Sequence, residues 1–290
     1  MDIARTFVTA DGATLAYRLW RPGRPRRTIV LLHGLASNHT RWSEFVRTTR
    51  LRESWDLLRP DLRGFGASVF HGRVGVGEWC RDLDAILAAE EAPSAVIGGH
   101  CLGANIGLHF ATRSPAATRG LVLIEPMFRQ ALTGSLRLAA RLRPPAAALT
   151  TLMRGLNRLG LYRRHLPTLD LEQLDREARA AMAAGGPAAF PEARYGSVLE
   201  DFKYTPTAVY LAGLSAVTGP LPDLRMVPAP ALALLSTGGK FGDPALTARL
   251  LAELPRGEVR MLPARHWIPT ESPAEMRRAI EEWCDRLQLG

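Results

Sequence analysis

One cysteine and one histidine have surroundings that point to chemistry. Cys101 lies in Gly99-His-Cys-Leu-Gly103, directly after the short apolar run Ala95 to Ile97. Small and apolar residues follow from Ala104 to Thr112, a composition that favours a helix. A strand that enters a helix through a tight turn bracketed by glycines holds its central residue under backbone strain and exposes its side chain. Cys101 is therefore a candidate nucleophile, and the start of a helix favours its thiolate form.

The candidate base is His266, in Leu262-Pro-Ala-Arg-His-Trp267, after the last predicted strand. A histidine within reach of a cysteine can take its proton and activate the sulfur. A third group, an acid, usually orients such a histidine. The sequence therefore predicts a Cys-His-acid triad.

The acid has two candidates. Asp243 follows the strand Ala231 to Leu235, but it directly precedes Pro244 and a helix, where a helix cap explains it fully. Glu125 ends the preceding strand in Leu123-Ile-Glu-Pro126. We favour Glu125, and Asp243 stays as the alternative.

The elements around these residues alternate between strands and helices. Predicted strands cover 6–9, 14–20, 28–32, 55–58, 95–97, 120–124, 231–235 and 259–262, and predicted helices begin near 40, 77, 104, 244 and 272. This alternation predicts an α/β fold with a mostly parallel, doubly wound sheet. Strand signals are missing from 127 to 228, where alanine- and leucine-rich helical segments predict an inserted cap. Residues 1–126 and 229–290 then form the core.

Composition bounds the function further. The chain has 290 residues, a formal charge of +9 and only two lysines, so arginine carries the basicity. Neither a nucleic-acid motif nor aromatic residues interleaved with basic ones are present. The three cysteines are widely spaced, with no metal-ligand pattern and no phosphate loop, so no cofactor is expected. The sequence has no apolar signal segment and no run that spans a membrane, which predicts a cytoplasmic protein with no membrane partner.

Taken together, these motifs resemble the α/β-hydrolase superfamily in its capped subgroup, with cysteine where most members have serine. The resemblance rests on His33-Gly34 after a strand, Asp61-Leu-Arg-Gly-Phe-Gly-Ala-Ser68, the Cys101 turn and the His266 loop. It implies an oxyanion hole formed by the backbone N–H groups of Leu35 and Leu102. It also suggests pocket roles for His33, which would shape the oxyanion loop, for His100 and for Trp42, although we favour core packing as the explanation of Trp42.

Three functions are compatible with this resemblance. The first is hydrolysis of an ester or thioester through an acyl-cysteine. The second is acyl transfer or Dieckmann-type cyclisation of a polyketide or peptide held on a carrier protein, and the third is non-catalytic binding. Two interpretations are open for the segment between Met127 and Leu169, which has eight arginines and no acidic residue: a solvated helix face of an arginine-rich protein, or a positive patch for an acidic carrier. The arginines are Arg129, Arg137, Arg141, Arg143, Arg154, Arg158, Arg163 and Arg164. The oligomeric state and the acyl group are not predicted.

Overall fold

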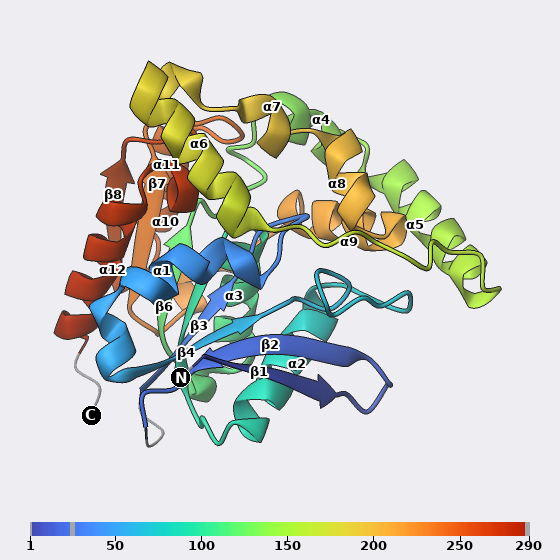
Figure 1. The fold of residues 1–290 in the computed structure, drawn as a ribbon, viewed down its shortest axis with the longest axis horizontal. Coiled ribbons are helices and arrows are strands. Elements are labelled where there is room, and N and C mark those ends of the chain that lie inside the picture. Colours follow the sequence, from blue (N-terminus) through green and yellow to red (C-terminus); the bar gives the residue numbers. More distant parts are fainter. Residues whose placement is uncertain (1, 24–26, 288–290) are drawn as a thin grey trace.

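A single eight-stranded sheet forms the centre of the computed structural model, which describes residues 2–23 and 27–287 (Figure 1). Its strand order is β1-β2-β4-β3-β5-β6-β7-β8. The strands are β1 Asp2–Val8, β2 Thr14–Trp20, β3 Arg27–Leu32, β4 Trp55–Pro60, β5 Ala95–His100, β6 Thr118–Ile124, β7 Ala231–Ser236 and β8 Gly257–Leu262. From β4 to β8 all pairings are parallel, whereas β2 pairs antiparallel with both β1 and β4. The mostly parallel sheet predicted from the sequence is confirmed, and the first two predicted strands pair as an antiparallel hairpin.

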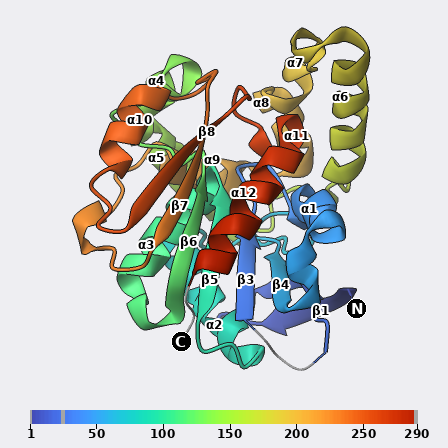
Figure 2. The same ribbon diagram turned by 90° about the vertical axis from the view of Figure 1, so that its left-hand side faces the viewer.

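Helices cover both faces of this sheet. They are α1 Ser43–Thr48, α2 Val76–Ala89, α3 Leu102–Arg113, α10 Pro244–Leu251, α11 Ile268–Glu271 and α12 Pro273–Arg286. Short 3₁₀ turns lie at His39–Trp42, Arg50–Glu53, Pro115–Ala117, Pro187–Ala189 and Leu224–Met226. Figure 2 shows α12 crossing one face of the strands. The helix expected from Thr40 is thus split into a 3₁₀ turn and α1, because Trp42 lies outside helical geometry at the junction.

Two hydrophobic cores follow from the alternation of side chains along each strand. In β3, Val30 and Leu32 pack into the core beneath α2 and α3. Ile29 and Leu31 point to the opposite face, into the core with α1 and α12. A strand that is buried on both faces has consecutive apolar residues in its sequence, and β3 shows this pattern. The α/β-hydrolase fold class predicted from the sequence is confirmed.

The chain between β6 and β7 is helical. It contains α4 Gly134–Arg141, α5 Arg143–Arg158, α6 Leu171–Gly185, α7 Glu192–Tyr195, α8 Val198–Tyr204 and α9 Thr207–Val217. Figure 1 shows these helices over one end of the sheet, with α5 at the outer edge of the molecule. We treat residues 127–228 as a cap, and its boundaries remain a proposal.

Candidate active site

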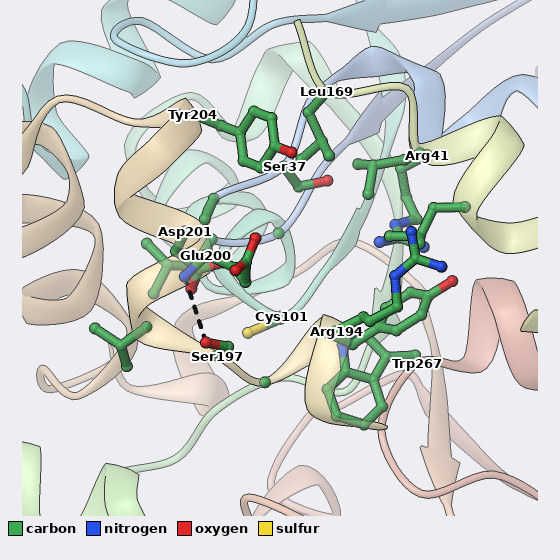
Figure 3. A pocket seen from close by; sticks show the side chains of 18 of the residues that line it. Ser37, Arg41, Cys101, Leu169, Arg194, Ser197, Glu200, Asp201, Tyr204 and Trp267 are labelled. Atoms are coloured by element: carbon green, nitrogen blue, oxygen red, sulfur yellow. Dashed lines mark hydrogen bonds between the residues drawn. The ribbon is translucent and has the colours of Figure 1, made fainter. Parts of the chain in front are cut away.

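Cys101 lies at the sharp junction of β5 and α3. Its backbone has φ 53° and ψ −109°, a conformation that is strained for a residue with a side chain. The Cys101 N–H donates to the carbonyl of Ile124 at the end of the neighbouring strand (2.8 Å), which fixes the turn. The thiol lines a cavity beneath the cap, and Figure 3 shows its sulfur pointing into that space.

The glycines on either side of this turn are required by close approach. A Cβ on Gly99 would lie 2.3 Å from the carbonyl carbon of Gly103, where α3 starts. A Cβ on Gly103 would lie 2.6 Å from the carbonyl oxygen of Leu32 on β3. Side chains at either position would force strand and helix apart, which explains why the turn is bracketed by glycine.

Leu35 and Leu102 lie on the two segments that meet at Cys101. Leu102 is the first residue of α3, so its N–H has no acceptor within the helix. Leu35 follows β3 in a loop that lines the cavity, and the neighbouring Gly34 approaches Cys101 so closely that a Cβ there would lie 3.6 Å from the Cys101 Cβ. The side chains of both leucines also approach Gly213 of α9. The two backbone segments that would form an oxyanion hole are thus neighbours.

His266 is buried between Cys101 and Glu125. Its Nδ1 donates to Glu125 Oε2 at 2.9 Å, which leaves Nε2 to hydrogen-bond with Cys101. Burial alone would lower the pKa of His266, but the hydrogen bonds and the negative charge of both partners outweigh burial and raise it to about 9. The folded site therefore favours the protonated form of the His266 imidazole at neutral pH.

Glu125 is held in place by the strand ends around it. Its φ is 52°, unusual for a residue other than glycine, and the Ser236 N–H at the end of β7 donates to its second oxygen, Oε1. Asp243, the alternative acid, instead caps α10 by accepting from the N–H groups of Ala245 and Leu246. The structure thus brings Glu125, and not Asp243, to the histidine.

A carboxylate that no sequence motif signalled holds the His266 loop. Glu271 of α11 accepts from the backbone N–H groups of Arg265, His266 and Trp267. Ser236 Oγ donates to the Arg265 carbonyl from the other side (3.0 Å). Glu271 lies only five residues after the histidine, but an acid at that spacing is common on helices, so its role emerges only from the folded loop.

The three residues with predicted pocket roles have different positions. His100 lines the cavity, and its Nε2–H donates to the His266 carbonyl (3.0 Å); burial and the charge of His266 hold its pKa well below the usual value. His33 is fully buried and donates to the Gly34 carbonyl while accepting from Leu62 N–H, so it shapes the loop as expected. Trp42 is fully buried among core side chains. Neither His33 nor Trp42 is among the residues that line the cavity, so we propose no substrate contact for either.

The cavity itself has a volume of about 720 Å³, large enough for a ligand of drug-like size. Cap residues that the sequence did not single out form much of its wall. Asp201 of α8 accepts a hydrogen bond from Tyr210 of α9, and both side chains line the cavity. Burial raises the pKa of Asp201 to about 7; the Tyr210 hydrogen bond opposes this shift and the charge of Glu200 adds to it. Nothing in the sequence pattern of α8 distinguishes Asp201 from a surface acid.

A buried ion pair joins the cap to the core beside this cavity. Arg41, from the 3₁₀ turn after β3, donates through Nη1 to Asp175 Oδ1 of α6 (2.5 Å) and to Thr270 Oγ1 (2.8 Å). Tyr195 of α7 donates to the same Asp175 oxygen (2.8 Å). Figure 3 shows Arg41 beside Arg194 on the wall opposite Asp201.

Cys80 and Cys284 provide an internal contrast to Cys101. Both are buried and free, and burial raises the pKa of each thiol to about 12, so neither is ionised at neutral pH. Within the described ranges, no group of three or more His, Cys, Asp or Glu side chains is arranged to hold a metal ion. No helix in that part of the chain has the length and apolarity needed to cross a membrane.

The chain is similar to several known proteins. A curated relative, 2-hydroxy-6-oxo-2,4-heptadienoate hydrolase of Pseudomonas putida, is 35% identical over 100 residues, which is 33% of this chain and only 36% of that protein. A probable alcohol acetyltransferase of Saccharomyces cerevisiae is 24% identical over 99% of this chain and 84% of its own length. An esterase from Thermogutta terrifontis shares the fold with a TM-score of 0.70 at 20% identity, covering 100% of both chains. The model of the alpha/beta hydrolase family matches residues 29–279, and the chain therefore belongs to that family.

Proposed function

We propose that this α/β hydrolase cleaves an acyl ester or thioester through an acyl-Cys101 intermediate. The observation that carries the proposal is the buried chain of hydrogen bonds from Cys101 through His266 to Glu125. Nucleophile, base and orienting acid follow three different strands; Cys101 and His266 line one cavity, and Glu125 is buried against His266. The family match and the hydrolase and esterase names of the relatives favour the same class of reaction.

The reaction would proceed in two steps. His266 takes the Cys101 proton, and the sulfur attacks the acyl carbon. A C–S bond forms while the carbonyl π electrons move to oxygen, to which the Leu35 and Leu102 N–H groups would donate hydrogen bonds. Collapse expels the alkoxide or thiolate, which takes a proton from His266. Water then attacks the acyl-cysteine with His266 as base, the C–S bond breaks, and the acid leaves. Glu125 would stabilise the imidazolium in both steps.

Intact-mass spectrometry after incubation with a panel of esters and acyl thioesters tests the intermediate. We expect a mass increase equal to the acyl group in the wild type and none in Cys101→Ala, which should also lose turnover. Cys101→Ser should keep weak esterase activity, because a serine hydroxyl needs stronger base assistance. Cys80→Ala is the matched control, because Cys80 is a buried thiol of raised pKa and should leave acylation unchanged. An alanine variant at position 101 with near-normal turnover would overturn the proposal, and a protein that no substrate acylates would point to a binding role.

Acyl transfer or cyclisation is the second candidate, with a carrier-bound chain as substrate. Similarity along nearly the whole chain to a probable alcohol acetyltransferase favours it. The two reactions share the acyl-enzyme and differ in what consumes it. Adding ethanol or a thiol to a turnover mixture would divert the acyl group into a new ester or thioester in a transferase, whereas a hydrolase would still release mainly the acid. A carrier-bound β-keto precursor that yields a cyclic product would identify a Dieckmann-type cyclase.

A further inference from the structure

The outermost helix of the cap, α5, exposes leucines to the solvent, while its inner side carries polar as well as apolar side chains. Leu149 and Leu152 of α5 and Leu159, which caps its C-terminal end, are 43%, 57% and 75% exposed. On the inner side, Arg154 donates to the Val74 carbonyl (2.6 Å) and Asn157 to the His71 carbonyl (3.1 Å), with Met153 and Leu156 only partly covered. A surface helix normally has the opposite arrangement, with its apolar side toward the core.

The exposed apolar surface continues beyond α5. We call residues 134–164 the cap arm; it comprises α4, α5 and the chain that follows α5. Besides these three leucines, it exposes four further large apolar side chains: Leu138 (57%), Leu142 (50%), Leu161 (63%) and Tyr162 (41%). These seven are half of the fourteen exposed large hydrophobic side chains of the described residues, so they form a concentration and not the usual scatter.

The cap arm is positively charged. It contains seven of the eight arginines of the candidate positive patch and no Asp or Glu. Arg137, Arg141, Arg158 and Arg164 are exposed, and none of the eight is among the residues that line the cavity. In α6, by contrast, Arg176 pairs with Glu172 one turn away. These four exposed arginines are therefore placed to act on something outside the protein, whereas Arg154 and Arg163 donate to carbonyls of the protein.

We propose that the cap arm docks on the surface of an anionic phospholipid membrane. Leucines on one side of a helix, with arginines around them, are the pattern that lies flat in a membrane interface, with the apolar groups among the acyl chains and the guanidinium groups on phosphates. Two copies of the arm facing each other would bring like charges together, so a dimer through this surface is disfavoured. An acidic carrier protein would satisfy the arginines but offers no extended apolar layer for the seven exposed apolar side chains of the arm.

This inference does not depend on the proposed acyl chemistry. The expectation of no membrane partner rested on the lack of a spanning segment, and contact with a membrane surface needs none. The arm is continuous with the cavity, because Ser135 and Leu136 of α4 belong to its lining. Docking would therefore bring an acyl cavity close to a lipid surface, where substrates with long apolar chains accumulate.

Co-sedimentation of the full chain with vesicles tests the proposal. We expect binding to vesicles of phosphatidylcholine and phosphatidylglycerol, at least about tenfold weaker binding to phosphatidylcholine alone, and release by high salt. The double variant Leu152→Asp/Leu159→Asp should bind at least about tenfold more weakly, because it places charge where the acyl layer must be met. Reversing Arg158 and Arg164 to Glu should have a similar effect on anionic vesicles.

Matched changes outside the arm serve as controls. Met226→Asp alters an apolar side chain that is 70% exposed, and Arg249→Glu/Arg256→Glu makes the same change in net charge as the arm variant. Both should bind like the wild type. The proposal is overturned if the wild type ignores anionic vesicles at low salt or if the controls weaken binding as much as the arm variants. Light scattering that shows a dimer broken by the leucine variant, or binding to a purified acyl carrier protein without vesicle binding, would identify a different occupant and equally overturn it.

Discussion

The catalytic edge of the sheet and the cap are built on opposite principles. At the edge, charged groups are buried and bonded to one another, as in the pairing of His266 with Glu125 and of Glu125 with the Ser236 N–H. The backbone there is strained at Cys101 and Glu125, where φ is positive. In the cap arm, apolar side chains are exposed, and the segment contains arginines but no Asp or Glu.

From this difference we infer different roles for the two regions: the sheet edge determines the reaction, and the cap determines access to it. Buried charges tolerate little movement, because a partner removed from a low-dielectric site leaves an uncompensated charge. Exposed leucines cost little when changed but are available to any apolar surface. We therefore propose that the residues at this edge determine the chemistry and that the cap determines which substrates and surfaces reach them.

The largest effect on activity is expected from a substitution of Glu125 at the sheet edge. Glu125→Gln should lower kcat by roughly 10²–10⁴-fold, because the amide cannot stabilise the imidazolium of His266. With the carboxylate charge gone, the pKa of His266 should also fall from about 9 toward its ordinary value. Turnover of a soluble thioester and NMR titration of His266 measure the two effects.

Asp243→Asn is the control for that experiment. Asparagine caps helices about as well as aspartate, so both stability and kcat should be close to wild type. If the Asp243 variant loses activity and the Glu125 variant does not, the acid has been misassigned.

The second substitution removes the buried ion pair of Arg41 with Asp175, which joins the cap to the core. Asp175→Ala leaves the Arg41 guanidinium buried without its carboxylate and should lower the free energy of unfolding by about 3 kcal/mol. The exposed pair of Glu177 with Arg194 is the matched case, so Glu177→Gln should leave the denaturation midpoint unchanged. Equal midpoints for all three proteins would mean that the cap is not anchored through Asp175.

The contrast also explains what could be predicted from the sequence. The strands, the sheet and the turn at Cys101 depend on local patterns: continuous apolar runs, glycines at close approaches and an order of elements that admits few topologies. Glu125 is favoured because the loop after Ala231 to Leu235 has glycine near the usual place of the acid, and because some members of the resembled superfamily have their triad acid at the end of the preceding strand.

Residues whose role depends on long-range packing were not predictable in this way. Glu271 holds the His266 loop, and Arg41 meets Asp175 across 134 positions of chain. Asp201 looks like an ordinary helical acid until burial beside Tyr210 changes its pKa. The outward leucines of α5 give the same periodicity as a buried face, so only the fold reveals which side they take.

A smaller effect, on the pH dependence of stability, is expected from Asp201 in the cavity. Because the pKa of Asp201 is raised to about 7, the folded protein holds this proton more tightly than the unfolded chain does. That contribution to stability is complete below about pH 4 and is lost as the pH rises through 7. Asp201→Asn should therefore match the wild type in acid and exceed its free energy of unfolding by about 1–2 kcal/mol at pH 8. Denaturant melts at pH 4 and pH 8 measure this, and a constant difference between the two proteins at both pH values would contradict it.

The smallest effect on stability should come from the cap arm, where an exposed side chain contributes almost nothing to the free energy of unfolding. Leu152 is 57% exposed, so Leu152→Gln removes little buried apolar surface and should change the free energy of unfolding by less than about 0.5 kcal/mol. Leu251, fully buried on α10, is its matched position in the core, and Leu251→Gln should cost roughly 3 kcal/mol or more because it buries an amide and disturbs the packing. Neither the fold nor turnover of a short soluble ester should depend on Leu152. A large loss of stability in the Leu152 variant would mean that this leucine is packed against the protein, and the arm would then have no free apolar face to present to a membrane.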